Sequence, residues 1–120
     1  MRVLAGDIGG TNARLAVFSV EGDRFETELT QVFPSARYSS LEEIVAEFVL
    51  SQGVSCRTAC FGVPGPVKDG RAEITNLPWV VEASKLARAA GVGRVAVIND
   101  LEAQAWGIAV LKPADLLVLN

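Results

Sequence analysis

The chain of 120 residues is long enough for one domain with a buried core but leaves no room for a second. Half of its residues are hydrophobic and 21% are charged, which is typical of a compact soluble fold. The net charge of -3, without a cluster of Lys and Arg, argues against a nucleic-acid or anionic-membrane surface. Because the chain has no histidine, Ser-His-Asp and Cys-His catalysis are excluded, and any general base must be Asp, Glu, Lys or Tyr.

The cysteines and the N-terminal segment bear on the cellular compartment. Cys56 and Cys60 would lie about 13 Å apart along a strand, whereas a disulfide needs Cα atoms within about 7 Å. We therefore expect both to be small buried residues of a reduced, cytoplasmic protein. The residues before Asp7 are too few for a signal peptide, and no apolar run reaches membrane-spanning length.

The chain is predicted to begin with three strands. A glycine pair ends the first, and the turn residues EGDR separate the second from the third. We expect an antiparallel meander over residues 2–8, 13–20 and 25–32.

A helix follows, capped by Ser39 or Ser40 and ended by Gly53. Its apolar residues recur at helical spacing, and its glutamates, on the other face, are expected to be solvated. The elements beyond it are a strand over 56–63, a hairpin with 68–71 at its tip, a helix over 83–90, an almost wholly apolar strand over 94–98, and a helix from 99 to about 111. This order predicts an α/β fold, a mixed sheet with helices on its faces.

The last residues predict one more buried strand, LLVL at 116–119, after which the sequence stops. A strand needs a partner and cover, and little chain remains to supply either. A fraying edge strand is the alternative, but we expect a truncation inside a larger protein.

The first candidate site is the segment 7–12 (DIGGTN), between the first two strands. Gly9 and Gly10 let backbone N–H groups approach an anion, and the side chains of Thr11 and Asn12 add donors. Asp7 could hold Mg²⁺ directly or through water, because hard cations prefer carboxylate oxygen. The absent lysine excludes a P-loop, and the strand that follows excludes a dinucleotide fingerprint. A plain hairpin turn stays open as the alternative.

The second candidate site is Asn99-Asp100, where an apolar strand meets a helix. Ligands gather at the carboxyl ends of strands in open α/β sheets. A carboxylate there can accept the proton of a substrate hydroxyl while phosphate is delivered in line. Capping is the other interpretation, since Asn99 with Glu102 fits a capping box and Asp100 suits the helix dipole. We expect the capping role in either case.

The third candidate segment combines residues 62–67 (GVPGPV) with 75–79 (TNLPW). Prolines on both sides of Gly65 predict a rigid loop at the carboxyl end of a strand. Asn76 could hydrogen-bond a sugar hydroxyl. Trp79 is expected to anchor the core or its rim rather than to stack on a sugar. Three further aromatic residues are predicted to be core: Phe48, Phe61 and Trp106.

These segments resemble, in order and spacing, the bacterial glucokinases of the hexokinase/actin-like superfamily. Residues 4–16 (LAGDIGGTNARLA) are similar to that family's first phosphate motif, GPV with TNLPW to its middle segment, and INDLEA at 98–103 to its sugar-site motif. Any one motif is weak, but the three together cover essentially the whole chain. A sister family of sugar kinases and sugar-responsive repressors shares the DIGGT opening, yet TNAR and DLEA favour the glucokinase type.

The resemblance implies a ribonuclease H-like (actin-like ATPase) lobe of a cytoplasmic, glycolytic enzyme that phosphorylates the 6-hydroxyl of glucose with ATP. Asp100 would be the general base, and Asn99 would bind the sugar beside it. Gly9, Gly10, Thr11 and Asn12 would approach the ATP phosphates, and Asp7 would organise Mg²⁺. Residues 1–111 would form the lobe and 112–120 the start of the connection to a missing C-terminal lobe, so the 120 residues alone should phosphorylate glucose negligibly.

Other functions are compatible with the same residues. One is a non-catalytic sugar-sensing or regulatory domain, and another is a related hexose or hexosamine kinase. The sequence separates neither glucose from mannose or glucosamine nor ATP from ADP or polyphosphate. No nucleic-acid or membrane partner is expected, and the oligomeric state, a homodimer included, is left open.

Overall fold

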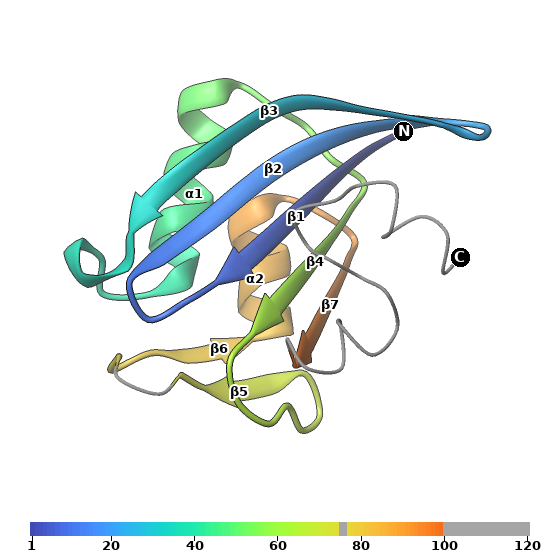
Figure 1. Cartoon of the computed structure of the whole chain (residues 1–120). Coiled ribbons are helices and arrows are strands. Elements are labelled where there is room, and N and C mark those ends of the chain that lie inside the picture. The colour runs from blue at the N-terminus through green and yellow to red at the C-terminus, as the bar shows by residue number, and fades with distance from the viewer. Residues whose placement is uncertain (75–76, 100–120) are drawn as a thin grey trace.

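The computed structural model describes residues 1–74 and 77–99, which form a five-stranded sheet, a two-stranded sheet and the helices packed on them (Figure 1). The expected helix over 99–111, the expected strand over 116–119 and the expected boundary at residue 111 fall outside the described residues. The elements are β1 (Arg2–Ile8), β2 (Asn12–Glu21), β3 (Arg24–Pro34), the 3-10 helix η1 (Ser35–Arg37), α1 (Leu41–Gln52), β4 (Thr58–Val63), β5 (Arg71–Glu73), β6 (Val80–Glu82), α2 (Ala83–Ala90) and β7 (Arg94–Asn99).

The larger sheet has the strand order β3-β2-β1-β4-β7. The strands β3, β2 and β1 are antiparallel neighbours, which confirms the expected meander, whereas β1, β4 and β7 are parallel. The sheet is therefore mixed, as predicted, and the change in pairing occurs at β1. Because β3, β1, β4 and β7 run in one direction, their carboxyl ends meet at one edge, the lower one in Figure 1.

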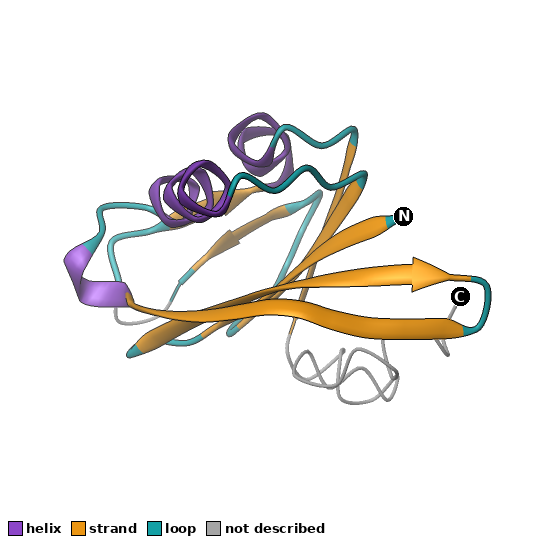
Figure 2. Cartoon of the chain, turned by 90° about the horizontal axis from the view of Figure 1, so that it is seen from above, coloured by secondary structure: helices purple, strands orange, loops and turns teal. Residues whose placement is uncertain are grey.

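Both α1 and α2 cover the same face of the large sheet (Figure 2). The side chain of Ser40 accepts a hydrogen bond of 3.2 Å from the backbone N–H of Glu43, so Ser40 rather than Ser39 caps α1. Both helices end at a glycine with positive φ, Gly53 and Gly91, as the sequence predicted.

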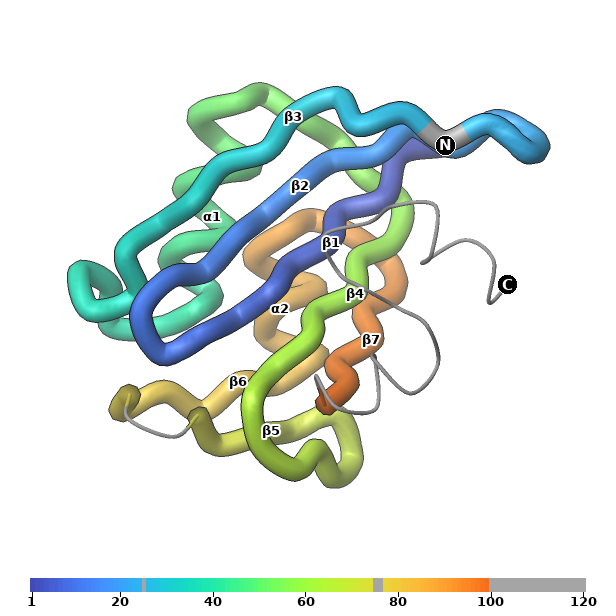
Figure 3. Tube along the Cα trace, in the orientation of Figure 1, coloured from blue at the N-terminus to red at the C-terminus, as the bar shows by residue number. Residues whose placement is uncertain are grey.

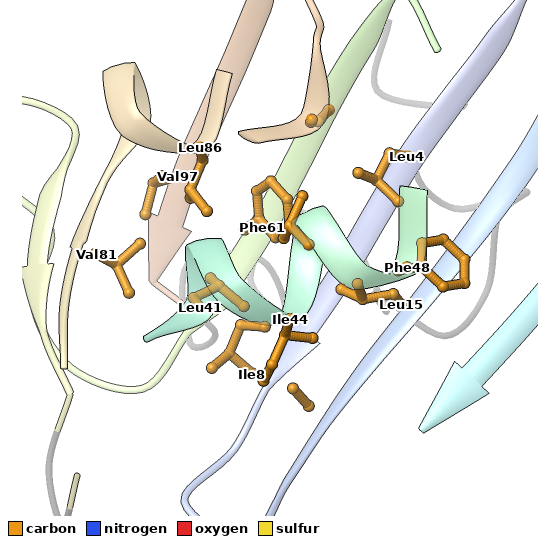
Figure 4. Close-up of a cluster of buried hydrophobic side chains, with 14 of the residues drawn as sticks. Leu4, Ile8, Leu15, Leu41, Ile44, Phe48, Phe61, Val81, Leu86 and Val97 are labelled. Carbon is orange, nitrogen blue, oxygen red and sulfur yellow. The ribbon is translucent and has the colours of Figure 1, made fainter. Parts of the chain in front are cut away.

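The core fills the space between this face and the helices (Figure 4). Trp79 is 2% exposed and its Nε1 donates to the Tyr38 carbonyl at 3.1 Å, which confirms its role as a core anchor. Gly6 packs directly against Phe61, since a Cβ at Gly6 would lie 2.5 Å from Phe61 Cδ1. The large, fully buried side chains are those of Leu4, Ile8, Leu15, Val17, Phe33, Leu41, Ile44, Val45, Phe48, Phe61, Val63 and Leu86.

The opposite face of the sheet carries smaller side chains. Ala5 is opposite Ala16 on β2 and Cys60 on β4, and Cys60 is opposite Ala96 on β7. Ala5 and Ala16 are buried with Phe18 in a cluster separate from the main core. Because side chains alternate along a strand, Asp7 lies on this face, two residues beyond Ala5.

The segment after β4 differs from the expected single hairpin. Asp69 and Gly70 do form a tight turn with positive φ, closed by two backbone hydrogen bonds of 2.9 and 3.0 Å between Lys68 and Arg71. However, β5 then pairs with β6, so a second and wider hairpin follows the predicted tip. The helix η1 was not predicted, because its residues SAR have no periodicity that marks a helix.

The glutamates of α1 were expected to be solvated, and Glu43 and Glu47 are indeed exposed, although both also accept side-chain hydrogen bonds. The carboxylate of Glu43 accepts a hydrogen bond of 2.6 Å from Ser39, and that of Glu47 accepts one of 2.7 Å from the Tyr38 hydroxyl. The hydrogen bond to Glu47 raises the pKa of Tyr38. The Oε1 atom of Glu42 is buried, with no hydrogen-bond partner among the described residues.

The two cysteines carry free thiols, with Cys56 buried and Cys60 half-buried. Burial raises the pKa of both thiols, so they stay protonated at neutral pH. In the part of the chain that the structure describes, no helix has the length and apolar character needed to cross a membrane.

Candidate functional site

The turn after β1, the loop after β4 and the end of β7, three parts that the sequence singled out, lie at the edge where the parallel strands end (Figure 3). Asp7 on β1 is opposite Gly62 on β4, and Gly62 is opposite Ile98 on β7, so the three form one row across the sheet. At the usual spacing between strands, the row spans about 10 Å. The turn after β1, the loop after β4 and the end of β7 therefore share one edge.

The turn of residues 9–12 joins β1 to β2. The N–H of Gly9 donates to the Asn12 carbonyl at 2.9 Å, and a Cβ at Gly9 would lie only 3.2 Å from that oxygen. Gly10, Thr11 and Asn12 are exposed. Within residues 1–74 and 77–99, nothing accepts a hydrogen bond from the backbone N–H of Gly10 or Thr11. The turn thus presents N–H donors to solvent, as an anion site requires.

Asp7 precedes this turn and is half-buried on the face opposite the helices. It is opposite Arg14 on β2 and Gly62 on β4. The described residues contain no group of three or more His, Cys, Asp or Glu side chains that could form a metal cage. A Mg²⁺ ion that keeps several waters and binds phosphate oxygens needs only one or two carboxylates. Asp7 therefore fits a metal held mainly by a nucleotide and water.

Sequence reasoning missed Ser35, the first residue of η1. Its exposed fraction is 0%, its hydroxyl donates to the Gly9 carbonyl at 3.0 Å, and its backbone N–H donates to the Thr11 carbonyl at 3.0 Å. A serine after a proline at the end of a strand is common in ordinary loops. The contact with the turn arises because β3 pairs with β2 up to Pro34, which is opposite Asn12.

Asn99 ends β7 and ties it to the loop after β4. Its side-chain Nδ2 donates to the carbonyl of Gly65. Gly65 has a φ of 105°, a conformation that favours glycine, so the loop between the two prolines depends on this residue. The side chain of Asn99 thus holds the carboxyl ends of two neighbouring strands together.

A surface hollow of about 730 Å³ adjoins the same loop. It mixes basic and acidic side chains, and one of them, Arg71, pairs with Glu82 at 3.2 Å. No residue of the turn 9–12 lines it, so the hollow and the turn are separate features. The lining residues are Pro66, Lys68, Asp69, Arg71, Ala72, Glu73 and Ile74.

Of the predicted site residues, the structure places Asp7, the turn 9–12 and Asn99 along one edge. Asn76 and Asp100 lie outside the described residues, as does the predicted core residue Trp106. Glu102, one of the two residues of the capping box expected at Asn99 and Glu102, also lies outside the described residues.

Comparison with known proteins gives a consistent result. A family model described as glucokinase matches residues 4–120. A glucokinase from Xanthomonas oryzae pv. oryzae is 36% identical over 116 residues, which make up 96% of this chain and 35% of that protein. The chain therefore spans about a third of the length of the curated relatives it matches.

Solved structures agree with this match. A glucokinase from an Antarctic psychrotroph is similar with a TM-score of 0.77 and 34% identity, over 88% of this chain and 34% of that one. A ROK family glucokinase from Streptomyces griseus, solved with glucose and AMPPNP, is similar with a TM-score of 0.63 and 29% identity, over 89% of this chain and 36% of that one. These similarities confirm the expected α/β fold, a lobe of the ribonuclease H-like, actin-like ATPase type.

Proposed function

Because this chain belongs to the glucokinase family, we propose that it forms one lobe of a kinase that transfers the γ-phosphoryl group of ATP to the 6-hydroxyl of glucose. The observation that carries the proposal is the shared edge, where the turn 9–12, whose N–H groups at Gly10 and Thr11 have no acceptor among the described residues, lies on the same side of the sheet as the end of β7. The Streptomyces griseus relative, solved with glucose and AMPPNP, supports both substrates. The remaining contacts to sugar and nucleotide belong to the part of the relatives that this chain does not span.

In this proposal the turn 9–12 holds phosphate oxygens. The exposed backbone N–H groups of Gly10 and Thr11 and the exposed side chains of Thr11 and Asn12 donate to them. Donors that are already oriented stabilise the charge that builds up during phosphoryl transfer without reorganising. Asp7 would hold Mg²⁺ directly or through water, and the ion would neutralise charge on the phosphate oxygens.

The sugar side of the site begins at Asn99. Asp100 follows it directly in the sequence, and we assign Asp100 as the general base that accepts the proton of the 6-hydroxyl as that oxygen attacks the γ-phosphorus. Asn99 and Asn76 hydrogen-bond other sugar hydroxyls. The hydrogen bond from Asn99 to Gly65 supports this assignment, because it ties the residue before Asp100 in the sequence to the loop after β4.

The test is Asp100→Asn in the full-length protein, assayed for glucose phosphorylation with ATP. Loss of a general base should lower kcat by about 10²- to 10⁴-fold, while glucose affinity measured by calorimetry stays within about threefold. Asp23→Asn is the matched control, because Asp23 is exposed in the turn between β2 and β3 and should leave both values unchanged. A sugar-sensing domain would bind glucose but show no turnover in the unmodified protein, and that result would refute the proposal.

Substrate range and location complete the proposal. Phosphorylation rates should be measured with glucose, mannose and glucosamine, each paired with ATP, ADP or polyphosphate. We expect glucose and ATP to be the preferred substrates. Residues 1–120 alone should give negligible turnover, because the second side of the cleft is needed to orient the reactants. We also place the protein in the cytoplasm, since its two free thiols suit a reducing compartment.

A further inference from the structure

Ser35 makes two contacts with the turn that its position on η1 does not require. Its hydroxyl donates to the Gly9 carbonyl and its backbone N–H to the Thr11 carbonyl, both at 3.0 Å. Ser35 is also the one polar side chain that is buried among the described residues. A buried hydroxyl normally has a partner, and here both partners belong to the turn.

The two contacts fix the orientation of two peptide units. A trans peptide is planar, so its N–H points away from its C=O. When the Gly9 carbonyl points toward Ser35, the N–H of Gly10 must point away from it. The Thr11 carbonyl likewise points toward Ser35, so the N–H of Asn12, which belongs to the same peptide unit, points away from Ser35. Ser35 therefore turns the N–H groups of Gly10 and Asn12 away from η1.

The hydroxyl of Ser35 also takes the place of a bond that usually closes such a turn. In a two-residue hairpin turn, the flanking residues exchange two backbone hydrogen bonds. The Gly9 N–H donates to the Asn12 carbonyl at 2.9 Å. The reverse hydrogen bond, from the Asn12 N–H to the Gly9 carbonyl, does not form in the described part of the chain. The Gly9 carbonyl bonds to Ser35 instead.

We propose that Ser35 is a positioning residue for phosphate binding, which keeps the turn 9–12 open and aims its N–H groups at the phosphate oxygens of a nucleoside triphosphate. This inference rests on the proposed function of the turn. Without the hydroxyl, the Asn12 N–H closes the turn onto the Gly9 carbonyl and is lost to the ligand.

The test measures the KM for ATP and for glucose in the full-length protein and in three variants. Ser35→Ala should raise the KM for ATP about tenfold, the effect of one hydrogen bond, and leave the KM for glucose within about twofold. Ser35→Cys keeps the side-chain shape at a slightly larger size but offers only a weak donor, so its KM for ATP should also rise. Ser51→Ala is the control, because the Ser51 hydroxyl also donates to a backbone carbonyl, that of Phe48, on an exposed part of α1.

A second readout needs no nucleotide. Hydrogen exchange should be slower at the Asn12 amide in Ser35→Ala than in the unmodified protein, because the turn closes. The inference is overturned if Ser35→Ala raises both KM values in proportion to a lower melting temperature, or if Ser35→Cys keeps the original KM for ATP. If the unmodified protein does not use ATP, the proposed function fails, and the exchange measurement still decides whether Ser35 holds the turn open.

Discussion

Gly6 on β1 packs directly against the Phe61 side chain on β4, so Gly6→Ala tests the packing beneath the candidate site. The added Cβ would lie 2.5 Å from Phe61 Cδ1, 2.9 Å from Phe61 Cε1 and 3.0 Å from Leu15 Cδ2. An ordinary contact begins at 3.4 Å, so the Phe61 ring must move by about 0.9 Å. Phe61 and Leu15 are both 0% exposed, which leaves the ring little space to move into.

Two effects of opposite sign set the magnitude. Overpacking a close-packed core costs about 1–3 kcal/mol, and the 2.5 Å contact favours the upper end. Replacing glycine by alanine also lowers the entropy of the unfolded chain, which stabilises the fold by about 0.4–1 kcal/mol. Overpacking therefore outweighs the entropy gain, and Gly6→Ala should lower the free energy of unfolding by about 2 kcal/mol.

Urea unfolding of a double-mutant cycle with Phe61→Val measures this effect. Valine lacks the Cδ1 and Cε1 atoms, so the double variant should be more stable than the sum of the single effects implies, with a coupling of at least about 1 kcal/mol. Gly93→Ala is the control, because a Cβ there meets no atom within 4 Å and the change should be neutral or slightly stabilising. Additive effects, or equal effects of Gly6→Ala and Gly93→Ala, would refute the packing explanation.

Two further predictions concern a helix cap and a thiol. Ser40→Ala should lower the free energy of unfolding by about 1 kcal/mol, because it removes the acceptor for the Glu43 N–H. Ser39→Ala should lower it by less than about 0.5 kcal/mol, because Ser39 makes only an exposed side-chain hydrogen bond. Thermal unfolding of both variants measures the difference, and equal losses of stability would contradict the prediction. Burial raises the pKa of the Cys60 thiol in the folded protein above its ordinary value of 9.0. The neutral thiol therefore contributes its full stability below pH 9.0, and this contribution is lost as the pH rises through the folded pKa. Cys60→Ala should therefore reduce the loss of stability above about pH 9, measured as urea midpoints across that range, and an unchanged pH dependence would contradict this cause.

Local sequence patterns were enough to predict most of the described elements and their order, with η1 and the β5–β6 hairpin as the exceptions. The strands β1 and β7 and both helices were recognised because their apolar spacing, caps and glycine stops are features of neighbouring residues. The mixed sheet followed from the order of these elements. The turn 9–12 was recognised as a candidate site for the same reason, since its glycines and donors are adjacent in the sequence.

Features that depend on distant contacts could not be predicted. Ser35 is 26 residues from Gly9 in the sequence, and only the pairing of β3 with β2 brings the two together. The hydrogen bond from Asn99 to Gly65 likewise depends on β4 and β7 being neighbours. The hydrogen bond from the Tyr38 hydroxyl to Glu47 was not predicted, because Tyr38 lies outside the helix. In each case the missing information was which strands or loops are adjacent in space.

In the proposed site, a hairpin turn takes the place that a helix N-terminus has in many other phosphate sites. Where a helix follows a glycine loop, the aligned peptides of its first turn orient the N–H groups. Here a strand follows, so the turn lacks that source of orientation and must be held from outside. The only described groups that hold its carbonyls from outside are the hydroxyl and the N–H of Ser35, at the end of the third strand of the meander. The antiparallel meander would therefore contribute to the proposed site through β3, because the pairing of β3 with β2 up to Pro34 places η1 beside the turn.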